Sequence, residues 1–403
     1  MGLPSGFNRL AWSNLAAQSA EQIGLAAAPI VAVLVLGAGA GATGLLQAAQ
    51  TLPFLLFAIP AGVLADRTSR RQVMTGAEAL RVASLVGILA LAWLDVLTLP
   101  LLAVLGFVGA CGTVAYSVAA PALVPALVPP AALAAANGRL ELARTVAFAG
   151  GPALAGALVG WTGGAPAFAV AATLSTCAVF LLAGLPEPAR PAPGARHAVS
   201  EVREGAGFVF RHRLLMPVYV TQVVFNTAFF MLQAVYVPYA VHRLGLSAAG
   251  VGATLATYGV GMVVGALLAP RIFRALPFGW VIALGPLAGL AAAVVMVATI
   301  WAPTAVLAGL SFFLIGAGPI VWVISTATLR QAVTPPVLLG RVSAINITGY
   351  GARPLGALLG AFVGGLYGVE ACLVIAALGF LVQALVIVAS PVVRLHRQPG
   401  MAE

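Results

Sequence analysis

A succession of long, nearly uncharged apolar runs is the feature that most constrains how this chain folds. Of its 403 residues, 62% are hydrophobic and 7% are charged, whereas soluble domains carry about 25% charged residues. About twenty apolar residues cross a bilayer as a helix, and the hydrocarbon interior admits only helices and closed barrels. The runs are too long, and too uniformly apolar, for barrel strands. The sequence therefore predicts an all-α membrane protein.

Twelve transmembrane helices are predicted from these runs. The longest polar stretch, from Pro186 to His212, divides them six and six. We expect an N-terminal six-helix bundle over 1–186, a cytoplasmic linker with an amphipathic segment over 187–213, and a C-terminal six-helix bundle over 214–403. The predicted spans are roughly 10–36, 44–65, 73–94, 100–127, 139–163, 165–185, 215–242, 250–270, 278–301, 304–328, 342–367 and 371–391.

The arginines predict the orientation of the chain. All 20 basic residues are arginine, and positive loops stay preferentially in the cytoplasm. With both termini cytoplasmic, every arginine except Arg243 and Arg353 falls at or just inside the cytoplasmic side. Topology therefore accounts for the net charge of +10, and nucleic acid is not an expected partner. We expect a multi-pass protein of the bacterial plasma membrane (the inner membrane).

The two halves repeat weakly. Gly156-x-x-x-Gly160 in the first half is matched by Gly356-x-x-x-Gly360 in the second. Parallel repeats of six helices are a transporter architecture, with the binding site near the midplane between the repeats. The repeat therefore predicts two pseudo-symmetric bundles around a central site.

The segment from Gly62 to Arg71, GVLADRTSRR, resembles the signature loop between helices 2 and 3 of the major facilitator superfamily, G-x-L-a-D-r-x-G-r-r. Ser69 stands where the second glycine is usual, which suggests a less tight turn. Three segments look like the drug-efflux branch that includes macrolide and enterobactin exporters. They are LQAAQTLPFLLFAIPAGVLADR, AANGRLELARTVAFAGGPALAG and GRVSAI…RPLGALLG. The resemblance covers essentially the whole chain and implies the major facilitator fold.

The piece Gly150-Gly151-Pro152-x-x-x-Gly156 is similar to a shortened antiporter motif of proton-coupled exporters. Such residues let helices approach closely and bend. Asp66, at the end of the second span, can accept hydrogen bonds that form when the inward mouth closes. The predicted gating residues are Gly62, Asp66, Arg67, Arg70, Arg71, Gly151, Pro152 and Gly156.

Glu21 lies about eleven residues into the first span, on one helical face with Asn14, Gln18 and Leu25. An ionisable residue in hydrocarbon costs about 2.5–3.5 kcal/mol and usually faces a cavity. Burial favours the protonated form of a carboxyl group, so Glu21 is the predicted proton carrier. The alternative is a permanently protonated or paired structural carboxyl.

A second polar and aromatic stripe runs along the seventh span, where Gln222 and Asn226 correspond to Asn14 and Gln18 of the first. The family resemblance implies that helices 1 and 7 line one central cavity. The candidate substrate contacts are Asn14, Gln18, Gln22, Gln222, Asn226, Phe229, Gln233, Tyr236, Trp322, Asn346 and Arg353.

Arg353 lies at mid-depth in the eleventh span, and three roles are open to it. It can pair with a carboxylate such as Glu21, meet an anionic group of the substrate, or point along the helix interface towards the second span. Two further pairs at i, i+3 spacing, Glu78 with Arg81 and Glu141 with Arg144, are interpreted as structural ion pairs near cytoplasmic helix ends.

The predicted function is proton-driven export of a small amphipathic compound, such as a drug, macrolide or siderophore, by alternating access. The alternatives are a proton-coupled importer or symporter of a metabolite, and a transporter that handles lysophospholipid. The expected partners are the small-molecule substrate, protons and membrane lipids, and the chain is expected to act as a monomer.

Enzymatic and metal chemistry is not expected. The four histidines fall in loops or at span ends, and the cysteines Cys111, Cys177 and Cys372 lie dispersed inside apolar runs. Such scattering argues against a catalytic constellation, a disulfide framework or a metal centre, and no motif calls for a cofactor.

Overall fold

The computed structural model describes residues 5–129, 132–186, 198–335 and 338–399. In these residues the chain is helical and forms no strand. The first bundle contains α1 (Ser5–Leu34), α2 (Ala40–Arg67), α3 (Arg70–Trp93), α4 (Leu99–Leu127), α5 (Leu133–Thr162) and α6 (Ala165–Ala183). The second contains α8 (Leu215–His242), α9 (Ala248–Ala275), α10 (Phe278–Ala298), α11 (Ala305–Val333), α12 (Leu339–Thr348), α13 (Ala352–Leu366) and α14 (Val369–Val388), followed by the 3₁₀ turn η4 (Pro391–Arg394).

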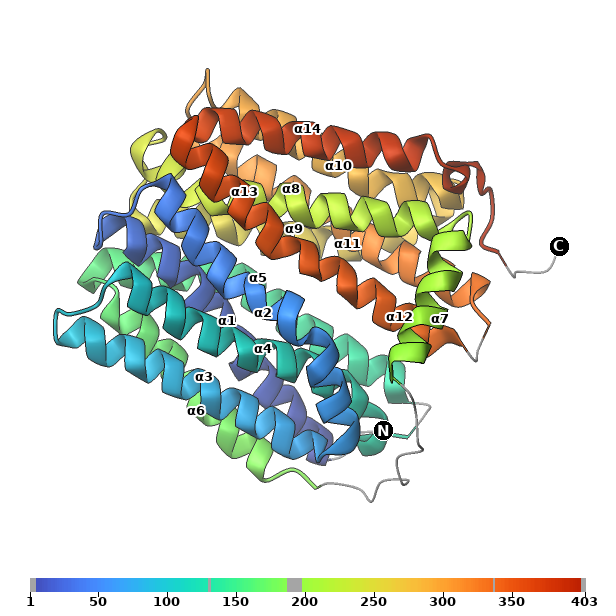
Figure 1. The fold of residues 1–403 in the computed structure, drawn as a ribbon, viewed down its shortest axis with the longest axis horizontal. Coiled ribbons are helices and arrows are strands. Elements are labelled where there is room, and N and C mark those ends of the chain that lie inside the picture. The colour runs from blue at the N-terminus through green and yellow to red at the C-terminus, as the bar shows by residue number, and fades with distance from the viewer. Residues whose placement is uncertain (1–4, 130–131, 187–197, 336–337, 400–403) are drawn as a thin grey trace.

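The two six-helix bundles predicted from the sequence are confirmed (Figure 1). Within the described residues, ten helices are long and apolar enough to cross a membrane. The two remaining predicted spans correspond to α2 and to the pair α12 and α13. The start of α1 lies beside the ends of α4 and α6, because Gly6 faces Leu127 and Pro186.

The eleventh predicted span is not one continuous helix. It is interrupted by a short 3₁₀ segment, η3 (Gly349–Gly351), between α12 and α13. Two glycines and Pro354 together weaken the helix here, because glycine favours other backbone conformations and Pro354 has no N–H to donate to the carbonyl group of Tyr350. The break places Tyr350 and Arg353 beside each other at the centre of the molecule, where both line one cavity.

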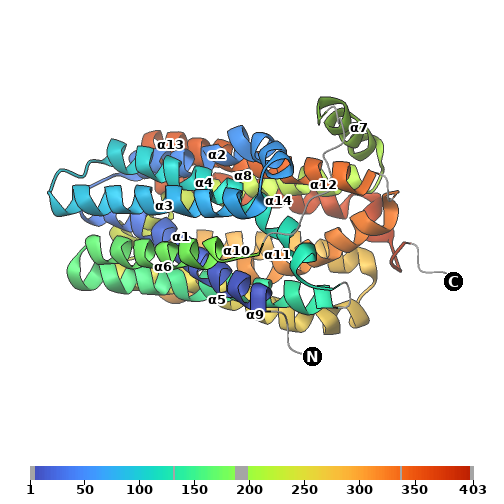
Figure 2. The same cartoon turned by 90° about the horizontal axis from the view of Figure 1, so that it is seen from below.

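The connecting segment contributes α7 (Ala198–Arg211), which packs against α12 (Figure 2). Val209 of α7 joins an apolar cluster with Val342 and Ile345, and Glu204 forms an ion pair with Arg341. The amphipathic segment predicted from the sequence is therefore a helix whose apolar side contacts the second bundle.

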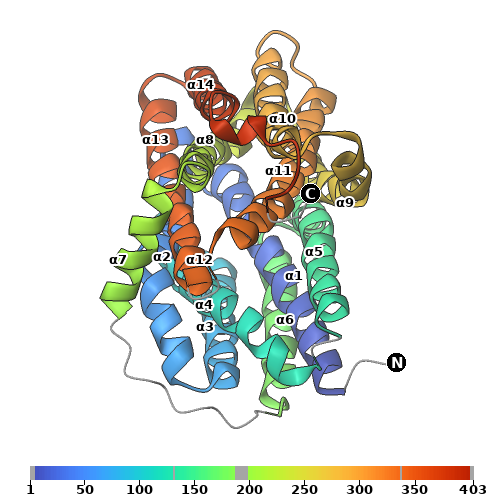
Figure 3. The same ribbon diagram turned by 90° about the vertical axis from the view of Figure 1, so that its right-hand side faces the viewer.

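The bundles touch closely at the end of the molecule away from α7. A Cβ atom on Gly156 of α5 would lie 2.4 Å from the carbonyl oxygen of Ala248, at the start of α9. A Cβ atom on Gly44 of α2 would lie 2.6 Å from Cα of Ala361 on α13. At these positions only glycine permits the observed helix separation. Figure 3, viewed from the α7 end, shows the two bundles arranged around a central axis.

Gly156→Val is expected to force α5 and α9 apart and to separate the bundles at this distal end. The measurement is the distance between spin labels attached after Trp93→Cys and Trp301→Cys, two exposed sites at the distal end of α3 and just after α10. The matched control is Gly150→Val on the same helix, where a Cβ atom meets nothing within 4 Å. We expect an increase of several ångströms for Gly156→Val alone; an unchanged distance would contradict the close-contact role.

Candidate substrate cavity and its buried charges

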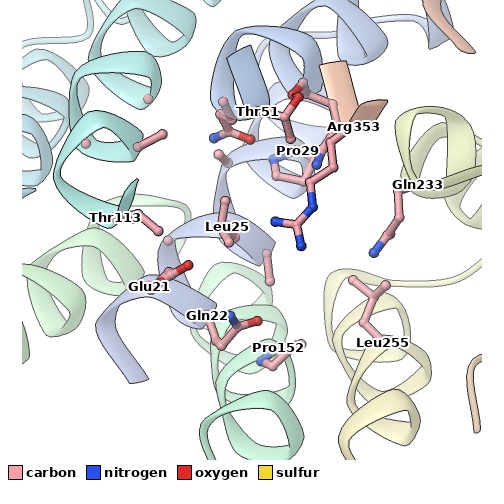
Figure 4. Close-up of a pocket in the computed structure, with 18 of the residues that line it drawn as sticks. Glu21, Gln22, Leu25, Pro29, Thr51, Thr113, Pro152, Gln233, Leu255 and Arg353 are labelled. Carbon is pink, nitrogen blue, oxygen red and sulfur yellow. The ribbon is translucent and has the colours of Figure 1, made fainter. Parts of the chain in front are cut away.

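A cavity of about 310 Å³ lies between the bundles, and a second of about 270 Å³ adjoins it (Figure 4). Both bundles line the first cavity, which contacts α1 to α6 on one side and α8, α9, α11 and α13 on the other. The second cavity is lined mainly by the C-terminal bundle. The residues that line both cavities are Arg144, Phe225, Asn226, Tyr258 and Arg353.

Most of the candidate substrate contacts line these cavities. In the first cavity are Gln22, Asn226, Phe229, Gln233 and Arg353, and Glu21, the predicted proton carrier, lines the same cavity. In the second are Gln222, Asn226, Trp322, Asn346 and Arg353. Residues from α1, α8, α11, α12 and α13 are thus brought together although they are far apart in the sequence.

Three candidates lie elsewhere. The Asn14 Nδ2 atom donates to the carbonyl oxygen of Leu140 at 3.3 Å, which joins α1 to α5. Gln18 is half-buried, and it lines neither of the two cavities. Tyr236 is fully buried, its hydroxyl is hydrogen-bonded to Thr254, and its ring packs edge-on against Phe312.

The structure therefore does not bring Asn14, Gln18 and Tyr236 to the lining of either cavity. Helical spacing correctly places the residues of each stripe on one face of their helix. However, a helix of about 30 residues meets different neighbours along its length. Asn14 lies before the part of α1 that reaches the cavity and bonds to α5. Tyr236 lies beside cavity-lining residues of α8, but α9 and α11 enclose its side chain.

The Glu21 carboxylate belongs to a charge network in the N-terminal bundle. Its Oε2 atom lies 3.5 Å from Nη2 of Arg81, while Nη1 of Arg81 lies 2.6 Å from Oε1 of Glu78. Arg81 also donates to the Thr113 hydroxyl at 2.7 Å, and Ser175 donates to the fully buried Glu78. One arginine therefore serves two carboxylates, and only Glu21 of these lines the cavity.

The predicted ion pairs are present, but they lie deeper than expected. Glu78 and Arg81 sit near the middle of α3, and Arg144 lines both cavities while it pairs with Glu141. The predicted spans begin at 73 and 139, whereas α3 begins at Arg70 and α5 at Leu133. Both helices thus begin several residues before the predicted spans, and the ion pairs lie correspondingly farther from the helix ends.

Arg353 occupies the boundary between the two cavities. Its Nε atom donates to Oδ1 of Asn226 at 3.2 Å. The ring centroids of Tyr350, Phe54 and Phe230 lie 4.4, 4.8 and 5.2 Å from its Cζ atom. Among the described residues no carboxylate pairs with it, so the expected alternative of an ion pair with Glu21 is not adopted. Its contact with Phe54 on α2 agrees with the alternative that directs it towards the second span.

A chain of amide hydrogen bonds supports Arg353. Asn226 donates to the carbonyl oxygen of Gln222 at 2.9 Å, and the Gln222 amide donates to the carbonyl oxygen of Asn346 at 3.0 Å. These bonds connect α8 to α12 just before the 3₁₀ break. The Asn226 side chain is thereby held with its oxygen facing the guanidinium group.

Sequence reasoning missed the contribution of α2 to the cavity. Gln47, Gln50 and Phe54 line it at i, i+3 and i+7 spacing, which is one helical face. This spacing was the signal that could have identified them. It was obscured because the apolar residues between them are equally periodic.

The candidate gating residues occupy two places. Gly151 packs against Gln22, Pro152 lines the first cavity, and Gly156 contacts α9. Gly62 is near the end of α2, and Arg70 begins α3.

The loop between α2 and α3 shows why serine suits position 69. Ser69 caps α3 by accepting a hydrogen bond from the backbone N–H of Gln72. Its φ of −60° requires no glycine, so the departure from the signature loop creates no strain. Arg71 donates to the carbonyl oxygen of Leu185 at 3.1 Å. The side chains of Asp66 and Arg67 lie outside the described part of the chain.

Comparison with solved structures shows the fold. A POT family transporter in complex with 5-aminolevulinic acid superposes with a TM-score of 0.78 and 11% identity, covering 97% of both chains. The nucleoside transporter NupG gives a TM-score of 0.72 at 13% identity, over 96% of this chain and 99% of NupG. A bacterial homologue of the iron transporter ferroportin, in an inward-facing state, gives 0.74 at 17% identity, over 96% of this chain and 99% of the homologue.

Comparison of sequences identifies a relative and the family of the chain. The multidrug efflux pump Tap of Mycobacterium tuberculosis is 26% identical over 236 residues, which cover 56% of each protein. The chain therefore spans just over half the length of this relative. Residues 12–399 match the family described as transmembrane secretion effectors. Since this match extends over nearly the whole sequence, the chain belongs to the transmembrane secretion effector family of major facilitator superfamily transporters.

Proposed function

We propose that this transporter is a proton-driven exporter of small amphipathic compounds in the bacterial inner membrane, acting as a monomer. The observation that carries the proposal is the Glu21 carboxyl group on the wall of a cavity shared by both bundles. Similarity to the multidrug efflux pump Tap supports export. The predicted orientation, with both termini cytoplasmic, defines which end of the transporter faces the cytoplasm during the transport cycle.

Glu21 is suited to gain and lose a proton because Arg81, its partner, also pairs with a second carboxylate. Arg81 contacts Glu21 at 3.5 Å but Glu78 at 2.6 Å. When Glu21 is protonated, Arg81 remains paired with Glu78 and bonded to Thr113. An arginine buried with no partner would be costly, and this arrangement avoids that cost. Proton transfer therefore changes the charge of the cavity wall without leaving Arg81 unpaired.

Alternating access follows from the contacts between the bundles. The bundles close on each other at the distal end through Gly44 and Gly156. In the predicted orientation this closed end faces outwards, and the cavities are reached from the cytoplasm. The segment from Gly62 to Arg71 lies at the opposite end, where we expect it to gate the inward mouth.

The available energy is sufficient for export. One proton that moves through 100 mV supplies about 2.3 kcal/mol. Since 1.4 kcal/mol is a factor of ten, one proton per cycle sustains roughly a fifty-fold gradient of a neutral compound. Two six-helix bundles that rock about a central site can use this energy without further cofactors.

Glu21→Gln is expected to abolish uphill efflux while downhill exchange persists, because the amide cannot carry a proton. The measurement uses everted vesicles and a compound to which a strain lacking the transporter is hypersensitive. Efflux driven by an imposed proton gradient is compared with counterflow. The control is Glu370→Gln, which removes a carboxylate that pairs with the partly exposed Arg243 at a helix end. Unchanged uphill efflux in Glu21→Gln would contradict the proposed role.

Import is the second candidate, because NupG is described as a nucleoside transporter and a further structure of the same fold is described as the peptide transporter POT. In right-side-out vesicles, an exporter is expected to keep internal substrate below the external concentration when a proton gradient is imposed. Proton-dependent accumulation above the external concentration would instead establish import. The control is vesicles that carry the Glu21→Gln variant.

A further inference from the structure

The cavities carry an excess of positive charge. The arginines that line them are Arg81, Arg144, Arg330 and Arg353, whereas Glu21 is the only carboxylate in either described lining. Glu78 and Glu141 behind the walls neutralise Arg81 and Arg144. Arg353 is different, because its charge lies deep between the bundles and meets no carboxylate among the described residues.

The contacts of Arg353 satisfy only part of the guanidinium group. A guanidinium has five N–H donors, and the described hydrogen bond to Asn226 uses one of them. The three aromatic rings contribute about 0.5–2 kcal/mol each, which is less than the cost of burying an unpaired charge. Figure 4 shows the guanidinium end of Arg353 pointing into the open centre of the cavity, towards the space between Leu25 and Gln233. The remaining donors are directed to where a ligand would lie.

Uncharged amides surround this space. Gln22 and Gln50 are 7% and 5% exposed, and both line the cavity. The Oε1 atom of Gln50 is buried and has no hydrogen-bond partner. The side chain of Gln233 reaches into the cavity opposite Arg353 (Figure 4). Buried polar groups are normally hydrogen-bonded, so the unsatisfied oxygen of Gln50 indicates room for a hydrogen-bond donor on the ligand, separate from the group that meets Arg353.

Aromatic side chains form one wall of the cavity. Phe225 and Phe229 stack with ring centroids 5.6 Å apart, and Phe229 also stacks against Tyr258 at 5.9 Å. With Phe54 and Phe230 they form an apolar wall next to the guanidinium group. A volume of about 310 Å³ is at the lower end of the range for sites that hold drug-sized ligands.

We propose that the cavity binds organic anions. A carboxylate, sulfonate or phosphate group of the ligand pairs with Arg353, and an aromatic or aliphatic body packs against the phenylalanine wall. This proposal rests on the proposed function in that the anion is the exported compound. An anion that leaves the cytoplasm also moves down the membrane potential, which contributes about 2.3 kcal/mol per charge at 100 mV. Arg353 thus determines which class of compound is carried.

The test measures equilibrium binding to the purified full-length protein in lipid nanodiscs, with no gradient present. The three probes have one ring system and differ in charge: 1-naphthoate, the neutral 1-naphthamide and the cationic 1-naphthylmethylammonium. We expect naphthoate to bind at least about ten-fold more tightly than naphthamide, which corresponds to about 1.4 kcal/mol, and the cation to bind most weakly. In Arg353→Gln the two affinities should become equal.

Two further variants complete the experiment. Arg353→Lys keeps the charge and should retain a preference for naphthoate. If Arg353→Gln does not fold, the binding preference of Arg353→Lys is the result that tests the proposal. Arg243→Gln, which removes a partly exposed arginine far from the cavity lining, should bind all three probes as the unmodified protein does. The proposal is overturned if naphthoate binds no better than naphthamide, including the case in which neither binds, or if Arg353→Gln folds and keeps the preference. Because no gradient is used, a failure of proton-driven export leaves these results unaffected.

Discussion

The structure depends on how each charge in the membrane interior is compensated. In a low-dielectric environment an ion pair repays the loss of hydration only when its geometry is good and its remaining donors are satisfied. Arg81 meets this condition through Glu78, Glu21 and Thr113. The pairing joins α3 to α1 and α4 and leaves one of its two carboxylates on the cavity wall. The same contacts that stabilise the N-terminal bundle thus position the candidate proton carrier.

Much of the fold could be predicted because the apolar runs in the sequence indicate the membrane-spanning helices. Eleven of the predicted spans correspond to single long helices, and the division into two bundles follows the polar stretch after Pro186. The break at Gly349–Gly351 was missed, because glycine and proline are common inside membrane helices and do not by themselves interrupt one. Ser69 illustrates the opposite case: an apparent departure from the signature loop proves to be an ordinary helix cap.

The site was predictable only in part, since sequence spacing assigns a residue to a helical face but not to a neighbour. The face that carries Glu21 was identified, yet Asn14 on that face bonds to α5 and Tyr236 is enclosed by α9 and α11. The surroundings of Arg353 come from α2, α8 and the 3₁₀ break, three segments that no local pattern connects. Long-range packing decides these contacts.

The position of α7 has a mechanical consequence. This helix is attached to the C-terminal bundle at both of its sides: Glu204 and Val209 contact α12, and His212 accepts hydrogen bonds from the backbone N–H groups of Leu214 and Leu215 at the start of α8. During a transport cycle α7 therefore travels as a rigid extension of that bundle. A force applied to α7 is transmitted through these contacts to the C-terminal bundle.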